Sequence, residues 1–213
     1  MKYKGIIFDL DGVIVSTDMY HYKAWKQLAD KLGIYFDEEI NNRLRGVSRM
    51  ASLDIILERS EVEYSEDEKV TFATEKNDNY RELLQQMTTA DLSDEVKSTL
   101  DKLRDLGLKL AIGSSSKNAP LILERIGLGD YFDAISDGNN ITHSKPHPEV
   151  FLIAAERIGL EPAECLVIED AEAGVDAAKN GNMDSAGINA AKDYEVANYH
   201  LDSFAEILDV VQD

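Results

Sequence analysis

Apolar residues follow two patterns along this chain: short unbroken runs, and residues that recur every three or four positions. Unbroken runs predict buried strands, whereas the three-to-four spacing predicts amphipathic helices. The first unbroken run ends at Phe8, and two carboxylates, Asp9 and Asp11, follow it together with Gly12. We therefore expect a short buried strand that ends in an acidic turn.

From residue 16 to residue 87 the helical spacing continues, and no stretch favours a strand. We expect helices at residues 17–33, 38–44, 51–57 and 65–87. The last of them begins with a capping box, Ser65-x-x-Glu68. Residues 16–87 are therefore expected to form an all-helical cap domain that is inserted directly after the first strand.

After residue 87, helical stretches and unbroken runs alternate. The helices are expected from Ser93 to Gly107, at residues 121–126, at residues 150–154 and up to Gly181, and the strands at residues 108–112, 131–135 and 165–168. This order implies an α/β fold: a Rossmann-like, doubly wound parallel sheet built from residues 1–15 and 88–213. Residues 182–187 are more polar than a buried strand usually is, so the sequence does not establish a last strand there.

Charge and composition restrict the partners. The net charge of -19 would repel a nucleic-acid backbone or an anionic membrane, but not a small phosphate ester, which responds to local charge. The single cysteine, Cys165, lies in an apolar run, which indicates a buried strand residue and excludes an internal disulfide. Asp9 and Asp11 interrupt the early apolar segment, and no run reaches membrane-spanning length. We expect a cytoplasmic protein, and a monomer because no exposed apolar signature is evident.

Asp9 and Asp11 are the first candidates for chemistry. A carboxylate at the carboxyl end of a buried parallel strand lies where open α/β sheets bind their ligands. Two carboxylates and a backbone carbonyl suit Mg²⁺, which is usually held together with substrate phosphate. Taken by itself, Asp-x-Asp-Gly is also an ordinary acidic turn.

Two other strand ends and one loop carry matching side chains. Hydroxyls and amides at residues 114–118 lead into a helix and can bind an anion. Lys145 adds a positive charge on a segment stiffened by prolines, and Glu169 and Asp170 add carboxylates at a third strand end. Taken singly, these are also a loop with flexible hydroxyls, a surface lysine and an acidic helix start. Together they predict phosphoryl transfer, in which catalysis comes from position and electrostatics.

Four motifs carry a resemblance to a known family. They are Phe8-Asp9-Leu10-Asp11-Gly12-Val13-Ile14, Gly113-Ser114-Ser115-Ser116-Lys117-Asn118, Ser144-Lys145-Pro146 and Ile168-Glu169-Asp170-Ala171-Glu172-Ala173-Gly174. With these motifs the chain resembles the haloacid dehalogenase superfamily, in the subclass with a helical cap. The motifs do not separate a mutase from a sugar-phosphate phosphatase.

The cap carries the finer resemblance. The segments Tyr20-His21-Tyr22-Lys23-Ala24-Trp25, Arg45-Gly46-Val47-Ser48-Arg49 with Ser52, and Lys76-Asn77-Asp78-Asn79-Tyr80 look like those of a sugar-phosphate mutase of that superfamily. Without the resemblance, these cap residues would be ordinary packing, turn and surface residues.

The resemblance implies roles for the residues at the strand ends. Asp9 would be the nucleophile that becomes an aspartyl phosphate, and Asp11 would be the general acid and base for the sugar hydroxyl. One Mg²⁺ ion would be held by Asp9, the carbonyl of Asp11 and Asp170, with Glu169 beside it.

The resemblance also implies which residues hold the substrate. Ser114 and Lys145 would hold the transferring phosphate, and His21 and Lys76 would help to position Asp11 when the cap closes. The remaining substrate contacts would be Trp25, Gly46, Val47, Ser48, Arg49, Ser52, Ser115, Ser116, Lys117 and Asn118. Among them, Arg49, Ser116, Lys117 and Asn118 would hold a second, non-reacting phosphate.

The activity implied by the resemblance is that of a sugar-phosphate mutase, which interconverts β-D-glucose 1-phosphate and glucose 6-phosphate. A sugar 1,6-bisphosphate would serve as the activating intermediate. Two alternatives stay open. One is a sugar-phosphate phosphatase that releases the same aspartyl phosphate to water, and the other is a non-catalytic binding protein that responds to phosphate.

Overall fold

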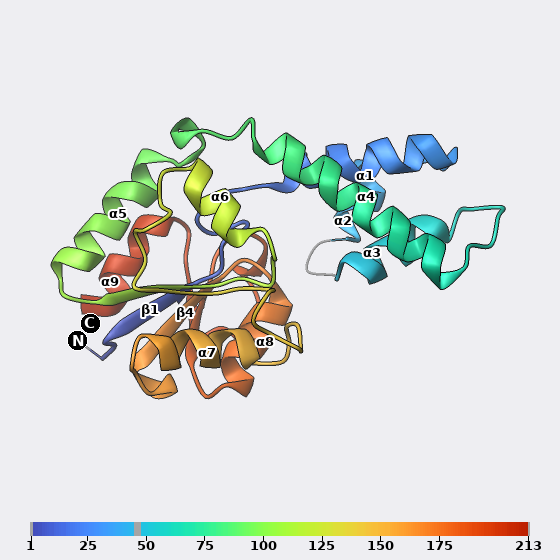
Figure 1. Ribbon diagram of the computed structural model, residues 1–213. Coiled ribbons are helices and arrows are strands. Elements are labelled where there is room, and N and C mark those ends of the chain that lie inside the picture. The colour runs from blue at the N-terminus through green and yellow to red at the C-terminus, as the bar shows by residue number, and fades with distance from the viewer. Residues whose placement is uncertain (1, 45–47, 213) are drawn as a thin grey trace. The chain divides into compact units, whose positions relative to one another are not determined.

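A computed structural model describes residues 2–44 and 48–212 of the chain (Figure 1). The chain divides into two compact units: residues 1–16 with 87–213, which we call the core, and residues 17–86, which we call the cap. Both junctions lie one residue away from those that the sequence suggested.

The described part of the core is built on a six-stranded sheet with the order β3-β2-β1-β4-β5-β6. Its strands are β1 (Gly5–Phe8), β2 (Lys109–Gly113), β3 (Ala134–Ser136), β4 (Cys165–Glu169), β5 (Asp184–Gly187) and β6 (Tyr199–His200). Neighbouring strands are parallel throughout. The chain winds outwards from β1 in both directions, so the predicted doubly wound α/β fold is confirmed.

The register of β1 brings three strand ends level with one another. Phe8 pairs with Ile112 of β2 and with Ile168 of β4. The next residues along the three strands are Asp9, Gly113 and Glu169. They therefore lie side by side at the carboxyl edge of the sheet, where open α/β sheets bind ligands.

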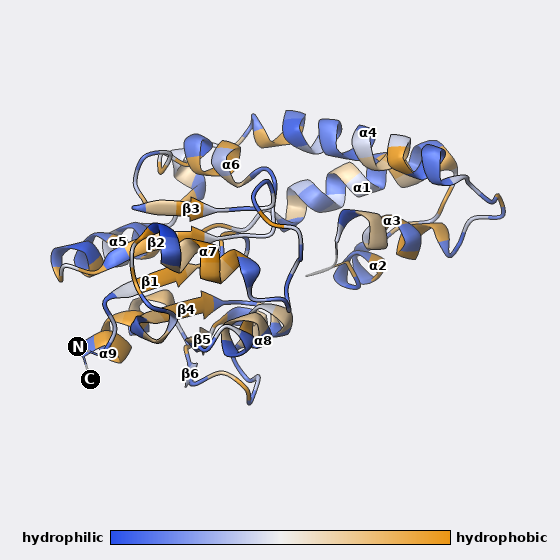
Figure 2. Cartoon of the chain, turned by 60° about the horizontal axis from the view of Figure 1, so that its bottom comes forward, coloured by the Kyte–Doolittle hydropathy of each residue, from blue (hydrophilic) through white to orange (hydrophobic). Residues whose placement is uncertain are grey.

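Helices cover both faces of this sheet (Figure 1). They are α5 (Asp94–Asp105), α6 (Ala119–Arg125), α7 (Glu149–Arg157), α8 (Glu172–Asn180) and α9 (Ile207–Gln212). Ile7 packs with Phe151 of α7 on one face, whereas the ring of Phe8 lies 5.7 Å from Phe204 and 6.2 Å from Phe132 on the other. Alternate residues of β1 thus fill two apolar layers, and Figure 2 shows the central strands as the most hydrophobic part of the core.

The strand expected at residues 131–135 is shorter and begins later, at Ala134. The amide of Tyr131 donates to the carbonyl of Leu128, which forms a turn. The amide of Leu110 in β2 donates to the carboxylate of Asp133 at 2.8 Å. A side chain, and not the carbonyl of a longer β3, therefore accepts this hydrogen bond.

The polar stretch at residues 182–187 does contain a strand. β5 pairs with β4 from Asp184 onwards. The amide of Ser185 donates to Asn198 Oδ1 at 2.9 Å, so its polar backbone is satisfied. Glycine is required at position 187 because a Cβ atom there would lie 2.3 Å from the carbonyl oxygen of Ala191. The sequence pattern gave no indication of β6 or α9.

The described residues of the cap form helices and no strand, as the sequence predicted. The helices are α1 (Asp18–Leu32), α2 (Glu38–Asn42), α3 (Arg49–Leu57) and α4 (Glu66–Leu84). They enclose an apolar core of their own that includes Trp25, Leu28 and Leu53. Ser65 and Glu68 form the predicted capping box at the start of α4. No helix among the residues that the structure describes is long and apolar enough to cross a membrane.

A substitution at Gly113 tests the packing at the strand ends. A Cβ atom there would lie 2.5 Å from Phe151 Cδ1 and 3.0 Å from Ile7 Cγ2. We expect Gly113→Ala to lower the free energy of unfolding by about 1–3 kcal/mol in urea denaturation, because the side chains of a packed core cannot move far enough to accommodate the added methyl group. Gly129→Ala is the matched control, since its nearest neighbour lies at 3.6 Å. Equal stability of the two variants would contradict the close packing.

Candidate active site

At the centre of the core site, one lysine forms ion pairs with two carboxylates, and the three residues come from three segments of the chain. Lys145, from the loop before α7, places its Nζ 2.6 Å from Asp9 Oδ1 and 2.5 Å from Glu169 Oε1. The side chains of Lys145, Asp9 and Glu169 are 10%, 11% and 1% exposed, respectively. The ring centroid of Phe151 lies 4.7 Å from the same ammonium and adds a cation–π contact. The structure thus brings together three residues that the sequence placed in one pocket.

The negative charge in this cluster exceeds what one lysine can balance. Burial disfavours the charged form of Lys145, but Asp9 and Glu169 outweigh this and raise the pKa of the ammonium. Burial also raises the pKa of Glu169, against the opposing effect of Lys145. For Asp170, burial and the neighbouring charges of Asp9, Glu169 and Asp11 raise the pKa to about 8.

This excess charge fits a divalent cation. The available donors are carboxylate oxygens and the backbone carbonyl of a tight turn, which are the ligands that Mg²⁺ prefers. A cation beside Asp170 would stabilise its carboxylate, whose pKa is raised by burial and by neighbouring negative charge. The residues present therefore suit the metal that the sequence predicted.

Two glycines allow the backbone to approach these carboxylates. Gly12 has a φ of +89°, and a Cβ atom on it would lie 2.0 Å from Asp170 Oδ2. A Cβ atom on Gly174, in the first turn of α8, would lie 1.9 Å from Glu169 Oε1. The acidic turn after β1 and the start of α8 therefore pack directly on the acidic cluster.

The loop after β2 has the features of an anion site. The Ser114 hydroxyl accepts the amide of Ser116, and the Ser116 hydroxyl accepts the amide of Asn118, both at 3.1 Å. Ser114 and Asn118 are buried, whereas Ser115 and Lys117 are exposed. Because Ser114 follows the strand that pairs with β1, this loop lies at the same edge of the sheet as Asp9.

A second polar cluster lies within the cap. Lys76 is 3% exposed, and its Nζ lies 2.9 Å from His21 Nδ1. The same ammonium is 4.6 Å from the ring centroids of both Trp25 and Tyr80, and His21 stacks on Tyr80 with centroids 4.1 Å apart. A lysine ammonium can only donate, so His21 Nδ1 accepts and the neutral ring carries its proton on Nε2.

Electrostatics keeps His21 neutral. Burial lowers the pKa of its imidazole well below the usual value of 6.5, and the charges of Lys76 and Arg49 lower it further. Arg49 is itself half-buried, and its Nη2 donates to Asn77 Oδ1 at 2.9 Å. Burial lowers the pKa of Arg49 as well.

The other predicted cap residues differ in their exposure and in their place in the cap. Ser48 is exposed and caps α3 by accepting the amide of Ala51 at 3.3 Å. Ser52 is buried in the first turn of the same helix. Gly46 and Val47 lie outside the described residues.

Sequence reasoning missed several residues that support the core site. Glu149 accepts the amides of Thr142 and His143 and so anchors the loop that carries Lys145. Asn189 donates from Nδ2 to the carbonyl of Gly12 at 2.7 Å and fixes the acidic turn. Glu149 was detectable only as an acidic residue at a helix start, and Asn189 carried no local signal.

Comparison with known proteins identifies the family. The model of the haloacid dehalogenase-like hydrolase family matches residues 3–182. The β-phosphoglucomutase of Bacillus subtilis is 42% identical over 187 residues, which cover 87% of this chain and 83% of that protein. The fructose-1-phosphate phosphatase YqaB of Escherichia coli is 32% identical, over 88% of this chain and 97% of that protein.

Solved structures agree with the sequence comparison. The crystal structure of β-phosphoglucomutase from Clostridium difficile has a TM-score of 0.89 and 41% identity, and the match covers 99% of this chain and 96% of that one. The two chains therefore share their fold over nearly their whole length. The chain belongs to the haloacid dehalogenase-like family, which confirms the resemblance seen in the motifs. Within that family it is an enzyme similar to the β-phosphoglucomutases over most of its length.

The lowered pKa of His21 makes the stability of the cap depend on pH. Below pH 6.5 the unfolded chain binds a proton on this imidazole that the folded cap excludes, so the free energy of unfolding falls as the pH drops from 6.5. We expect His21→Gln to remove part of this slope between pH 6.5 and pH 5. Urea denaturation followed by the fluorescence of Trp25, the single tryptophan, reports on the cap. His200→Gln, in the core, is the control and should keep the slope.

Proposed function

We propose that this enzyme is a Mg²⁺-dependent mutase that interconverts β-D-glucose 1-phosphate and glucose 6-phosphate. The observation that carries the proposal is the buried Lys76 beside a neutral His21, with Arg49 nearby, because hydrolysis at the core site alone requires no such polar cluster in the cap. The similarity to two β-phosphoglucomutases over most of the chain supports it. A cytoplasmic location and a monomeric state belong to the same proposal.

Asp9 is the nucleophile in this mechanism. Lys145 donates to its Oδ1, which orients the carboxylate and leaves Oδ2 to accept the phosphoryl group. The resulting aspartyl phosphate divides one transfer into two steps. Lys145 and the hydroxyl of Ser114 stabilise the charge on the transferring phosphoryl oxygens.

Asp11 moves the protons. When phospho-Asp9 gives its phosphoryl group to the 6-hydroxyl of β-glucose 1-phosphate, Asp11 takes the hydroxyl proton and β-glucose 1,6-bisphosphate forms. After the bisphosphate has turned around, Asp9 takes the 1-phosphoryl group and Asp11 returns the proton to the sugar oxygen. Glucose 6-phosphate then leaves, and Asp9 is phosphorylated again.

The metal and the second phosphate complete the assignment. Asp9, the carbonyl of Asp11 and Asp170, with Glu169 beside them, would hold Mg²⁺, which neutralises charge on the phosphoryl oxygens. Arg49 would hold the non-reacting phosphate, because its planar fork matches phosphate geometry. The residues assigned with it are Ser116, Lys117 and Asn118. The remaining substrate contacts would be Ser115, His21, Trp25, Ser48, Ser52 and Lys76.

A sugar-phosphate phosphatase is the second candidate. Relatives at 32% and 30% identity are a fructose-1-phosphate phosphatase of Escherichia coli and a phosphorylated carbohydrates phosphatase of Thermotoga maritima. Both reactions use the same aspartyl phosphate, so the acidic cluster alone does not distinguish them.

A phosphorus NMR time course separates the two activities. The protein is incubated with Mg²⁺, β-glucose 1-phosphate and a trace of β-glucose 1,6-bisphosphate. We expect glucose 6-phosphate to accumulate with little inorganic phosphate. Accumulation of inorganic phosphate instead would establish the phosphatase. Asp9→Asn is the control that should abolish either reaction.

Arg49 tests the second phosphate site. We expect Arg49→Ala to lower kcat/KM for β-glucose 1-phosphate roughly 10- to 100-fold, which corresponds to the loss of a charge-assisted hydrogen bond of about 1.5–3 kcal/mol. Arg43→Ala is the matched control in the same unit, since Arg43 is exposed and pairs with Glu58 at 2.9 Å. Coupled assay of glucose 6-phosphate measures both variants. An unchanged kcat/KM for Arg49→Ala would remove Arg49 from the proposed site.

A further inference from the structure

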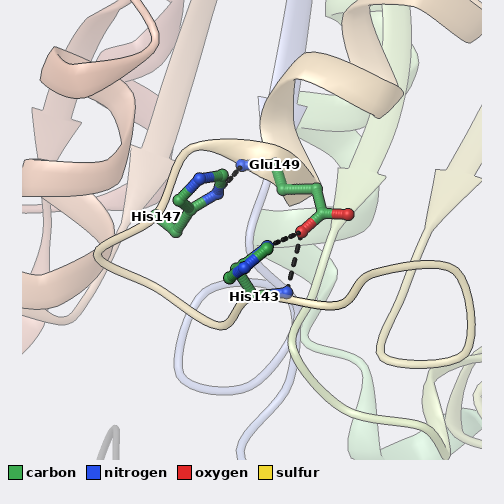
Figure 3. Close-up of side chains that lie close together, drawn as sticks. All are labelled: His143, His147 and Glu149. Carbon is green, nitrogen blue, oxygen red and sulfur yellow. Dashed lines mark hydrogen bonds and ion pairs between the residues drawn. The ribbon is translucent and has the colours of Figure 1, made fainter.

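Three side chains that the proposed mechanism does not use lie close together in the segment that leads into α7 and at its first residue. They are His143, His147 and Glu149, and their potential ligand atoms all lie within 4.8 Å of one another. His143 Nδ1 is 3.1 Å from Glu149 Oε2, and the two imidazole rings are 4.5 Å apart with an interplanar angle of 29°. Figure 3 shows both rings beside Glu149, with His143 directed at its carboxylate. We infer that His143, His147 and Glu149 form a binding site for Zn²⁺.

The carboxylate of this site is already fixed in place. Glu149 accepts the amide of His143 at 2.7 Å and the amide and hydroxyl of Thr142 at 3.1 and 2.9 Å. These bonds hold the pKa of Glu149 at about 2, so it is ionised at any pH at which zinc binds. The amide and hydroxyl of Thr142 occupy Oε1, whereas Oε2 accepts the amide of His143 and lies 3.1 Å from His143 Nδ1. When the His143 ring turns to a metal, one lone pair of Oε2 becomes available to the same ion. Donors around a ligating carboxylate are the usual outer shell of a metal site.

The backbone between the two histidines is also restrained. Pro146 and Pro148 flank His147 and limit its backbone torsion angles. The amide of His147 donates to the carbonyl of Ser144 at 3.0 Å and closes a turn, and Asn180 donates to the carbonyl of Pro146 at 3.0 Å. The binding of a metal therefore has to order only the two imidazoles.

The ligand atoms can reach a metal by side-chain rotation alone. Ligands of a tetrahedral zinc ion at bond lengths of about 2.0–2.1 Å lie roughly 3.3–3.4 Å from one another. The separations here, 4.8 Å or less, need to shrink by at most about 1.5 Å, and the side chain of His143 is 64% exposed and able to move. His147 Nδ1 now accepts the amide of Glu149 at 3.3 Å, a long bond that a rotation of the ring can exchange for a metal.

The donor set selects the ion. Two imidazole nitrogens and one carboxylate suit Zn²⁺, whereas Mg²⁺ prefers oxygen ligands alone. Three protein ligands with a position left for water is a common zinc arrangement. The site is thus chemically distinct from the acidic cluster of Asp9, Glu169 and Asp170.

The site brackets the lysine of the active site. His143 and His147 lie two residues before and two residues after Lys145, whose ammonium bonds to Asp9 and Glu169. An ion bound to both histidines would close the segment 143–149 into a ring and restrain Lys145. This restraint follows from the geometry of the chain and does not depend on which phosphoryl transfer the enzyme performs.

Calorimetric titration of the full chain with Zn²⁺, in excess Mg²⁺ to occupy the acidic cluster, tests the inference. We expect one equivalent of Zn²⁺ to bind and hydrogen exchange of the amides in residues 143–149 to slow. His143→Gln and His147→Gln should each weaken binding at least tenfold, whereas His200→Gln, an exposed histidine in β6, should leave it unchanged. Circular dichroism checks that the variants are folded.

Two results would overturn the inference. The first is the absence of Zn²⁺ binding to the folded wild-type chain. The second is binding that persists unchanged in the folded double variant His143→Gln/His147→Gln, which would assign the ion to another set of ligands.

Discussion

The buried ammonium of Lys145 is the interaction on which the active site depends. Without it, Asp9 and Glu169 would meet as uncompensated charges at the edge of the sheet, at a large cost in desolvation. The two bonds it makes join β1, β4 and the loop before α7 in one place. The same positive charge orients the carboxylate of Asp9. One contact therefore stabilises the carboxyl edge of the sheet and positions the proposed nucleophile.

Lys145 leaves part of the negative charge unbalanced, and that remainder defines what the site can bind. Burial and this remaining negative charge together raise the pKa of Asp170, and Gly12 and Gly174 let the backbone pack directly against the carboxylates of Asp170 and Glu169. The cap contains the opposite arrangement. Lys76 lies beside two aromatic rings and Arg49 is half-buried. Burial and the charges of these two cations lower the pKa of His21 and keep it neutral. In the proposed function, the first cluster would bind a metal-bound phosphoryl group, and Arg49 of the second would bind a free phosphate.

Much of the fold was accessible from local pattern. The unbroken runs predicted β1, β2 and β4, and the capping residues Ser65 and Ser93 marked the starts of α4 and α5. The shorter β3 and the polar β5 were harder to predict, because side chains take part in their pairing: Asp133, directly before β3, accepts the amide of Leu110 in β2, and Asn198 accepts the amide of Ser185 in β5. Such partners leave no trace in the hydrophobic spacing of the strand itself.

The sequence by itself determined the kind of residue that stands at each strand end, since those positions follow directly from periodicity and motifs. Only the tertiary structure decided which of them share charge: Lys145 and Asp9 are 136 positions apart, and their contact depends on the register of β1 against its neighbours. The grouping of His143, His147 and Glu149 is local by comparison, since the turn from Ser144 to His147 and the amide of His143 hold it together, but the hydrophobic spacing does not show that turn. Local pattern depends on neighbours along the chain, whereas a site depends on neighbours in space.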